Sequence, residues 1–430
     1  MRIPKTLALG SALAISAALT MSGCGSTSNS GSSSAGSTEG NDGQISLTVA
    51  TFNEFGYEDL FKEYEQLHPE IKIVHKKAAT SNEAHDNLNT RLAAGSGLAD
   101  IEAVEVDWLP QLLEYSDKFN DLSGDDVKGR WLDWKVAAAT DHEGRLIAFG
   151  TDSGPEAVCY RADLFEQAGL PSDREEVAKL LSGDWSNYFK VGTEFNSKTG
   201  IPWFDSANAT YLGMINQVEY PYEKEDGTPI PLKENAKVKE FYDQLAAAHK
   251  ISAHFEQWSE DWTTSFQNNG FATMLCPGWM LGVIEGNASG VQGWDIANVF
   301  PGGGGNWGGS YLTIPTQSEH FEQARELAAW LTAPEQQIKA FKAVGAFPSQ
   351  VEALDNQELL GQTSAFFNDA PTGQILSERA KAVKVHPYKG AAYWGINTVV
   401  GDAIQRFENG TDSPEASWQK ALDEYEELGY

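Results

Sequence analysis

The alternation of strand and helix patterns over residues 45–115 is the feature that most constrains the fold. Apolar runs of strand length alternate with segments whose apolar residues recur at helical spacing. This order predicts an α/β lobe built on a largely parallel sheet. The pattern predicts strand 45–52, a helix closed by Pro69, strand 71–74, a helix from Ser81 to Gly95, and a strand that runs into a helix at Trp108–Pro110.

Length and charge narrow the class of protein. A chain of 430 residues is too long for one ordinary core, so we expect two domains. Its formal net charge of −30 argues against nucleic acid, because a phosphate backbone requires a basic face. The same charge disfavours an anionic membrane surface or an anionic substrate as the main partner. An acidic surface that keeps a secreted protein soluble is the simplest interpretation.

The N-terminus has the pattern of an export signal. Arg2 and Lys5 precede an apolar run at 7–21 that is too short to span a bilayer comfortably, so residues 1–23 are predicted to be a signal peptide. The run ends in MSGCG, which resembles the lipobox of bacterial lipoproteins and predicts a lipidated Cys24. Residues 24–44 are rich in Ser and Gly and are expected to form a flexible tether. An ordinary secreted protein with a chance cysteine is the alternative.

A glycine-rich stretch with three tryptophans, residues 275–315, suggests a ligand site. It contains Trp279, Trp294 and Trp307, and six glycines fall within residues 302–309. Glycine permits positive φ and close backbone approach, so indole rings here can border an opening instead of filling a core. The stretch runs into the apolar segment SYLTIP, which reads as a buried strand. We interpret it as a chain crossing between two lobes at a ligand cleft.

Several motifs, in order, carry a family resemblance over residues 45–430. They are TVATF, FKEYEQLHPEIKIV, LAAGSGLADI, VEVDWLPQLLEYSDKFNDLS, GTDSGPEAVCYRADLFEQAGLP, DWSNYF, FATMLCPGWMLG, GGSYLTIP and ARELAAWLTAPEQQIKAF. The set resembles the extracellular solute-binding proteins of carbohydrate ABC transporters, the group that includes maltose-binding protein. It is most similar to the actinobacterial branch that captures β-linked gluco-, manno- or galacto-oligosaccharides.

The resemblance implies a fold, a location and partners. The fold would be α/β, of the two-lobe periplasmic-binding-protein-like type II, with interleaved lobes and a three-segment hinge. Lobe 1 would comprise 45–153 and 309–347, and lobe 2 would comprise 154–308 and 348–430. The expected protein is a lipid-anchored monomer on the extracellular face of the cell membrane. It would bind an oligosaccharide and deliver it to ABC permease subunits, with no cofactor and no nucleic acid partner.

The same resemblance bears on the two cysteines that remain after Cys24. It puts the strands that carry Cys159 and Cys276 side by side in the second lobe, which implies a disulfide. Such a bond is permitted outside the cell. Two buried thiols that behave as small apolar groups are the alternative.

The sequence lacks common enzyme motifs, but one pair of carboxylates is a candidate catalytic pair. The chain has no GxSxG, HExxH or GxxxxGK[ST] pattern, and its eight histidines are dispersed without a ligand spacing, so we expect neither a catalytic site nor a metal. Glu105 and Asp107, spaced i,i+2 on a strand, would lie about 7 Å apart, within the range for glycosidase carboxylates. A lipid-anchored glycoside hydrolase using this pair stays open as an alternative. Capture of a non-sugar solute such as a polyamine or peptide is another.

The binding hypothesis rests on aromatic and polar residues at strand ends and in turns. The apolar face of a pyranose packs on an aromatic ring, while its hydroxyls need directional partners. In an open α/β sheet, ligands lie beyond the carboxyl ends of the strands. The candidate ligand-binding residues are Asn53, Glu54, Phe55, Glu105, Asp107, Asp152, Ser153, Trp203, Asp205, Trp258, Trp279, Trp307 and Trp394.

Overall fold

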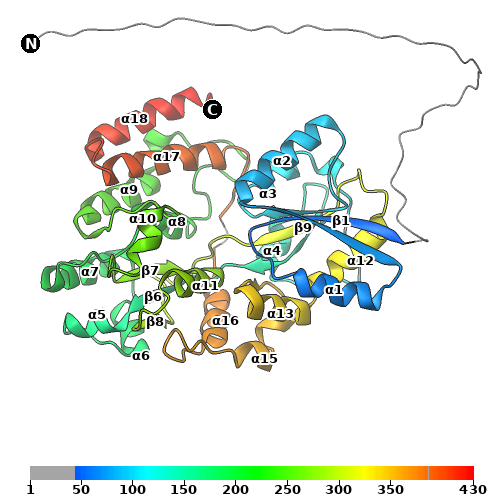
Figure 1. Cartoon of the computed structure of the whole chain (residues 1–430). Helices are drawn as coiled ribbons and strands as arrows, with labels where there is room; N and C mark the ends of the chain where they lie inside the picture. The colour runs from blue at the N-terminus through cyan, green and yellow to red at the C-terminus, as the bar shows by residue number, and fades with distance from the viewer. Residues whose placement is uncertain (1–43, 386) are drawn as a thin grey trace, which may run out of the picture. The chain divides into compact units, whose positions relative to one another are not determined.

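The computed structural model describes residues 44–385 and 387–430 (Figure 1). The chain divides into two units, Met1–Asn41 and Asp42–Tyr430, and every described residue belongs to the second. The predicted signal peptide, Cys24 and the tether up to residue 43 therefore lie outside the described residues. Within the described ranges, no helix is long and apolar enough to cross a membrane.

A five-stranded sheet with the order β2-β1-β3-β9-β4 organises the N-terminal part of the chain. β1 pairs in parallel with β2 and β3, whereas β9 pairs antiparallel with β3 and with β4. The strands β1, β2, β3 and β4 therefore run in one direction and β9 runs in the opposite one, so the predicted largely parallel sheet is confirmed with one antiparallel strand added. The elements around it are β1 (Ile45–Phe52), α1 (Glu58–Leu67), β2 (Ile71–Ala78), α2 (Ser81–Ala94), β3 (Ile101–Glu105), α3 (Leu109–Leu113), η1 (Ser116–Lys118), α4 (Asp133–Ala138), β4 (Ala148–Gly150), β9 (Ser310–Thr313), α12 (Phe321–Leu331) and α13 (Pro334–Val344).

Local sequence explains the first helices of this sheet. The connections from β1 to β2 and from β2 to β3 run in opposite directions across the sheet, so right-handed crossovers put α1 and α2 on opposite faces, as Figure 1 shows. The N-cap of α2 is Thr80, whose side chain accepts a hydrogen bond from the Glu83 backbone N–H, one residue before the predicted cap. The helix ends at Gly95, whose φ of 68° is left-handed.

The core of the five-stranded sheet draws on two distant parts of the sequence. Buried residues between Leu47 and Phe149 pack with buried residues between Tyr311 and Ala340. The later segment supplies β9, which lies between β3 and β4. β4 ends at Gly150 and β9 begins at Ser310. The chain therefore leaves this sheet after β4 and returns to it about 160 residues later. We refer to this sheet and its core as the first half.

A three-stranded antiparallel sheet, β7-β6-β8, organises the second half. Two hydrophobic clusters cover it, one centred on Tyr160 and Trp203 and one on Cys159 and Trp294. The elements of this half are β6 (Ala157–Arg161), α5 (Ala162–Gln167), α6 (Arg174–Leu180), α7 (Trp185–Thr199), α8 (Ala207–Ile215), η2 (Leu232–Glu234), α9 (Ala236–Ala248), η3 (His249–Ile251), α10 (Glu260–Ser265), β7 (Thr273–Cys276), α11 (Gly278–Asn287), β8 (Trp294–Ala297), α14 (Val351–Leu354), α15 (Gln357–Leu360), α16 (Thr372–Ala382), α17 (Tyr393–Glu408) and α18 (Pro414–Glu427).

Three crossing segments connect the two halves and contact one another. β5 (Asp152–Ser153) pairs antiparallel with β10 (Phe347–Pro348). The Trp307 backbone N–H donates to the Gly154 carbonyl at 2.8 Å, which ties the first crossing to the second. A Cβ atom on Gly154 would lie 1.7 Å from the Trp307 carbonyl oxygen. Only glycine allows the two backbones to approach this closely.

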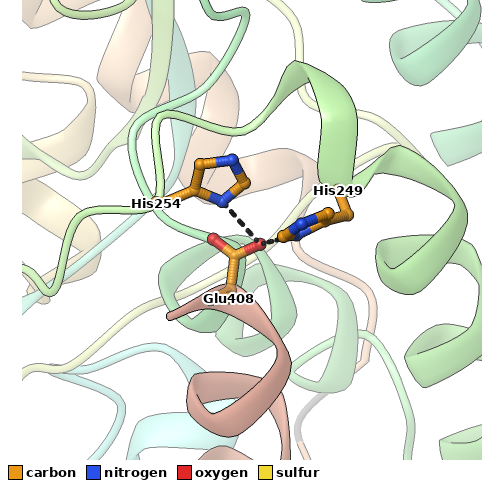
Figure 2. Close-up of side chains that lie close together, drawn as sticks. All are labelled: His249, His254 and Glu408. Atoms are coloured by element: carbon orange, nitrogen blue, oxygen red, sulfur yellow. Dashed lines mark hydrogen bonds and ion pairs between the residues drawn. The ribbon is translucent and has the colours of Figure 1, made fainter. Parts of the chain in front are cut away.

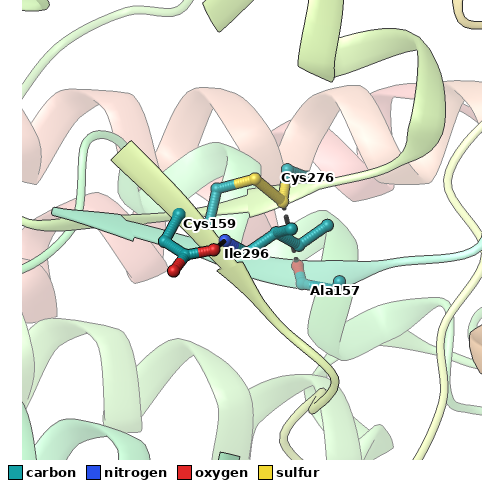
Figure 3. The surroundings of a disulfide bond; sticks show 5 residues. Ala157, Cys159, Cys276 and Ile296 are labelled. Carbon is teal, nitrogen blue, oxygen red and sulfur yellow. Dashed lines mark hydrogen bonds between the residues drawn. A yellow bond between two sulfur atoms is a disulfide. The ribbon is translucent and has the colours of Figure 1, made fainter. Parts of the chain in front are cut away.

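A disulfide joins the two neighbouring strands β6 and β7 (Figure 3). Cys159 and Cys276 are fully buried, with an S–S distance of 2.08 Å and a Cα–Cα distance of 5.8 Å. Ala157 lies opposite Cys276 and Met274 lies opposite Cys159, so the two cysteines are offset by two residues in the pairing of β6 with β7. The bond closes a loop of the second half across a sequence separation of 117.

Candidate functional site

Three tryptophans of the second half form a contiguous aromatic cluster. Trp279 lies in the first turn of α11, directly after β7, and Trp258 lies over it with ring centroids 6.1 Å apart and planes 22° from parallel. Trp307 meets Trp279 edge to face at 5.1 Å, and the Trp279 indole N–H donates to the Trp307 carbonyl at 3.2 Å. Trp258 is 59% exposed. This indole trio, Trp258, Trp279 and Trp307, therefore presents aromatic surface to solvent.

Asp205 forms hydrogen bonds with two residues that lie close to Trp258 in the sequence. Its carboxylate is buried and accepts hydrogen bonds from the Gln257 side-chain amide at 2.7 Å and from the Trp262 indole N–H at 2.9 Å. Burial raises the pKa of Asp205 to about 6. The prediction that Asp205 itself contacts a ligand is therefore corrected, since its described hydrogen bonds fix the residues on either side of Trp258.

Two carboxylates from the end of β3 lie beside the trio. Glu105 ends the strand, and Asp107 follows in a turn in which its backbone N–H donates to the Glu105 carboxylate at 2.7 Å. The expectation that both lie on one strand is therefore wrong for Asp107. A Cβ atom on Gly308 would lie 3.7 Å from both Glu105 Oε1 and Trp279 Nε1. Gly308 therefore lies between the Glu105 carboxylate and the Trp279 indole.

Lys389, from the second half, reaches the carboxylates of the first. Its ammonium forms an ion pair with Asp107, and its side chain is 5% exposed. Burial, followed by the Asp107 charge, raises the pKa of Glu105 well above its usual range, and the Lys389 charge opposes that rise. The ion pair of Asp107 and Lys389 therefore bridges the two halves next to the aromatic cluster.

A second buried ammonium lies close to the first crossing. Lys135 is buried, with its nitrogen 3.8 Å from the centre of the Tyr311 ring, and burial lowers its pKa to about 8. Asp152 lies nearby and accepts hydrogen bonds from the Ser310 backbone N–H at 2.8 Å and from the Thr151 hydroxyl at 2.9 Å. Asp152 is partly exposed, so it can hold the crossing and still offer an oxygen to a ligand.

Trp394 lies apart from the indole trio in its described ring contacts. It is 45% exposed near the start of α17, and its ring faces His85 of α2 at 6.3 Å. His85 in turn packs on Trp108 at 5.0 Å and lies 2.7 Å from the Gln111 side-chain oxygen. Trp394 and His85 therefore form a second contact between residues of the two halves.

Trp203, a predicted ligand residue, and Trp294 are core residues instead. Trp203 is fully buried among Phe165, Tyr188 and Phe195, so neither face of its ring is available. Trp294, which the glycine-rich stretch suggested as a border residue, is 1% exposed in β8. The reason in both cases is that a large apolar ring next to a strand end can point inward as easily as outward.

Two further predicted ligand residues, Phe55 after β1 and Ser153 at the first crossing, are also buried. Phe55 is 8% exposed and packs on Phe52 and Tyr57 in the core. Ser153 is fully buried, and its hydroxyl donates to the Pro348 carbonyl at 3.1 Å, which serves the β5–β10 pair. Both predictions are therefore corrected.

Asn53 and Glu54 are exposed at the end of β1, as expected of residues that could meet a ligand. Glu54 accepts a hydrogen bond from the Lys77 ammonium at 2.6 Å. Asn53 adopts a left-handed conformation with φ of 46°, which asparagine tolerates better than most residues. Their role in binding stays a prediction.

Sequence reasoning missed Lys389, His85 and Glu156. Glu156 directly follows the first crossing, is fully buried, and has no hydrogen-bond partner for either carboxylate oxygen among the described residues. Burial raises its pKa to about 8. A glutamate beside the Gly154–Pro155 crossing could have drawn attention, whereas nothing in the sequence links Lys389 to Asp107.

The family is identified by comparison with known proteins. A profile described as bacterial extracellular solute-binding protein matches residues 59–371. The chain belongs to this family. An arabinooligosaccharide-binding protein of Bacillus subtilis (strain 168) is 26% identical over 347 residues, covering 76% of this chain and 78% of that protein. Because the family binds solutes, the chain is a binding protein and not an enzyme, so the hydrolase alternative for Glu105 and Asp107 is wrong.

Solved structures give the fold. An extracellular solute-binding protein of family 1 is 50% identical, with a TM-score of 0.84 over 90% of this chain and 100% of that one. An ABC-transporter-associated binding protein from B. animalis subsp. lactis Bl-04, in complex with β-1,6-galactobiose, is 20% identical with a TM-score of 0.73, covering 90% and 99%. These similarities confirm the predicted α/β two-lobe solute-binding fold. The exact lobe boundaries stay a prediction.

Proposed function

We propose that this protein captures oligosaccharides outside the cell for an ABC importer. The observation that carries the proposal is the exposed indole of Trp258 stacked on Trp279, with the Glu105 carboxylate close to Trp279 on the other side of Gly308. Sugars combine apolar ring faces with hydroxyl edges, and they are bound by flat aromatic surface next to hydrogen-bond acceptors. Both kinds of group meet at this point of the protein.

The energetics of such a site are sufficient for capture. A micromolar Kd corresponds to about −8 kcal/mol. Carboxylate oxygens accept hydroxyl hydrogen bonds that are stronger than neutral ones. Two stacked sugar rings and a few hydroxyl contacts reach that total. Asp107 and Asp152 are the charged acceptors that we assign to the hydroxyls, Glu105 with its raised pKa is a further hydroxyl partner, and the indole trio with Trp394 supplies the stacking surfaces.

The relatives support an oligosaccharide in preference to a monosaccharide. Two curated relatives are named arabinooligosaccharide-binding proteins, and one structural neighbour holds β-1,6-galactobiose. The galactobiose complex, together with the resemblance to the actinobacterial branch, supports a β-linked gluco-, manno- or galacto-oligosaccharide as the ligand. A polyamine is disfavoured by the Lys389 ammonium, which already neutralises Asp107 and would repel a second cation.

The proposed mechanism is closure of two lobes around the sugar. We assign residues 45–153 and 309–347 to the first lobe, and 154–308 and 348–430 to the second. The crossings at Gly154, Gly308–Gly309 and Phe347–Pro348 would absorb the rotation. The sugar binds the closed form more tightly than the open form and so shifts the population toward the closed form. The permease subunits then bind the closed, monomeric receptor and receive the sugar from it.

Calorimetric titration of the purified protein tests the sugar assignment. The panel contains cello-, manno-, arabino- and β-1,6-galacto-oligosaccharides, together with spermidine and a mixed tripeptide. We expect a micromolar Kd for at least one β-linked oligosaccharide and no heat with spermidine or the peptide. Binding of spermidine or the peptide in place of every sugar would reject the proposal.

The location forms a separate part of the proposal. We propose that residues 1–23 are removed, that Cys24 is lipidated, and that residues 24–44 tether the receptor to the outer face of the cell membrane. Two acyl chains anchor a protein stably, where a single chain would be marginal. The Cys24→Ala variant should move from the membrane fraction to the medium. Retention of that variant in the membrane fraction would contradict the anchor.

A further inference from the structure

Two histidines and a glutamate that are not among the residues assigned to the sugar meet in the second half (Figure 2). Glu408 is the last residue of α17, His249 begins η3, and His254 lies in the loop that follows. Nδ1 of His249 lies 3.2 Å from Glu408 Oε1, and Nδ1 of His254 lies 3.4 Å from the same oxygen. Dispersed along the sequence, these groups gave no ligand spacing, but folding brings them together.

The two nitrogen–oxygen distances match those between the ligands of a tetrahedral metal ion. Zinc binds imidazole nitrogen at about 2.0–2.1 Å and carboxylate oxygen at about 2.0–2.2 Å, so neighbouring ligand atoms lie roughly 3.4 Å apart. All three ligand atoms of the cluster fall within 4.8 Å of one another. The side chain of His254 is 39% exposed, so its ring can turn toward a common centre without disturbing the core.

The charge at Glu408 independently favours a cation. Its side chain is 4% exposed and stands at the C-terminal end of a 16-residue helix, where the helix dipole disfavours a negative charge. Its described partners are the two histidines and the hydroxyl of Ser252, which donates at 2.6 Å. An imidazole supplies positive charge only when it is protonated. A bound metal ion would supply that charge with both imidazoles neutral.

The surroundings of the cluster orient its ligands. Ser252 holds Glu408 Oε2 and also accepts a hydrogen bond from the His254 backbone N–H at 3.1 Å. His254 adopts a left-handed φ of 60°, an uncommon conformation for a residue with a side chain. Hydrogen bonds of this kind commonly fix the ligands of metal sites. Here they direct His254 and Glu408 toward the same point.

We propose that His249, His254 and Glu408 bind one divalent transition-metal ion, zinc being the best fit, with water completing the coordination. Two nitrogen ligands and one oxygen suit zinc and its neighbours, whereas calcium and magnesium prefer oxygen alone. The ion would link the end of α17 to the loop after α9. It stabilises the second half and takes no part in binding the sugar.

Zinc titration of the metal-stripped full-length protein tests the site. We expect one ion per chain, a melting temperature about 3 °C higher at 100-fold excess over Kd, and loss of both effects in H254A and E408Q. H142A, which removes an exposed imidazole elsewhere, is the matched control and should bind like wild type. Cobalt in place of zinc should give the visible absorption of a tetrahedral site.

Two results would overturn the proposal. One is that wild-type protein binds no zinc in the micromolar range. The cluster would then form only hydrogen bonds and ion pairs among its own side chains. The other is zinc binding that H254A and E408Q retain while both variants keep the wild-type circular dichroism. Sugar affinity measured in the same variants should stay unchanged, so failure of the metal site can be told apart from failure of the sugar site.

Discussion

Trp258 holds a backbone conformation that its own side chain disfavours. Its φ of 72° is left-handed, which costs a bulky residue on the order of 1–3 kcal/mol unless the surroundings enforce it. The surroundings do so here, because Gln257 and Trp262 both donate to the buried Asp205. Strain that is enforced around an exposed aromatic residue points to a binding role for that residue.

Removal of this indole should weaken sugar binding and leave the fold intact. We expect Trp258→Ala to raise Kd for the oligosaccharide by about 30-fold, equivalent to about 2 kcal/mol, because one stacking surface is lost. Leu67→Ala is the control, since Leu67 is also 59% exposed and lies in α1. Calorimetric titration measures both variants. Equal affinities in Trp258→Ala and wild type would remove Trp258 from the site.

Glu156 should make stability depend on pH. Its pKa is raised from 4.5 to about 8 by burial, so the folded state holds the proton more tightly than the unfolded state does. The contribution is fully present below about pH 4.5 and is lost as pH rises through 8. We expect Glu156→Gln to match wild type at pH 5 and to be more stable by up to about 4 kcal/mol at pH 8.5.

Denaturant unfolding at the two pH values measures this difference. Glu426→Gln, which changes an exposed glutamate in the last helix, serves as the control and should show no such dependence. A Glu156→Gln variant whose difference from wild type is the same at pH 5 and pH 8.5 would mean that Glu156 is ionised in the folded protein.

At the scale of single elements, Gly154 in the first crossing and Gly282 in α11 differ in how much space surrounds them. A Cβ on Gly154 would meet the Trp307 carbonyl at 1.7 Å, whereas a Cβ on Gly282, in the middle of α11, would meet nothing within 4 Å. The same substitution at the two positions therefore has opposite consequences.

We expect Gly154→Ala to destabilise the protein by about 3 kcal/mol or more, because backbone cannot yield as a side chain can. Gly282→Ala should stabilise it by about 0.5–1 kcal/mol, because alanine favours a helix more than glycine does. Thermal and denaturant unfolding of the two variants provide the comparison. A Gly154→Ala variant as stable as Gly282→Ala would show that the crossing can rearrange.

Elements with strong local patterns were predictable, and contacts between distant segments were not. Residues 45–52 and 310–313 are apolar runs in the sequence, and both are strands in the structure. The antiparallel pairing of β9 with β3 has no local signal, so the direction of β9 was not predicted. Burial of Trp203 depends on the rings that surround it, which no turn pattern reveals.

At the scale of the whole molecule, the ion pair of Asp107 and Lys389 joins the two halves across 282 positions of sequence. Such a pair cannot be predicted from the sequence around either residue, because nothing near Asp107 or Lys389 links one to the other. Burial makes the pair consequential, since loss of one partner leaves the other charge uncompensated.

A double-mutant cycle measures this link. We expect Lys389→Met to cost about 3–5 kcal/mol of unfolding free energy at pH 8, because Asp107 and Glu105 lose their cation. Asp107→Asn combined with Lys389→Met should cost less than the sum of the two single changes. Additive effects would mean that the pair contributes no coupling between the halves.

The bond between Cys159 and Cys276 has a practical consequence for anyone who produces this protein. A chain made in a reducing cytosol would fold with two thiols where the secreted chain has a covalent staple across 117 positions. By the chain-entropy estimate that difference is worth about 4–5 kcal/mol. Recombinant material should therefore be oxidised before its stability is compared with that of protein exported by a living cell.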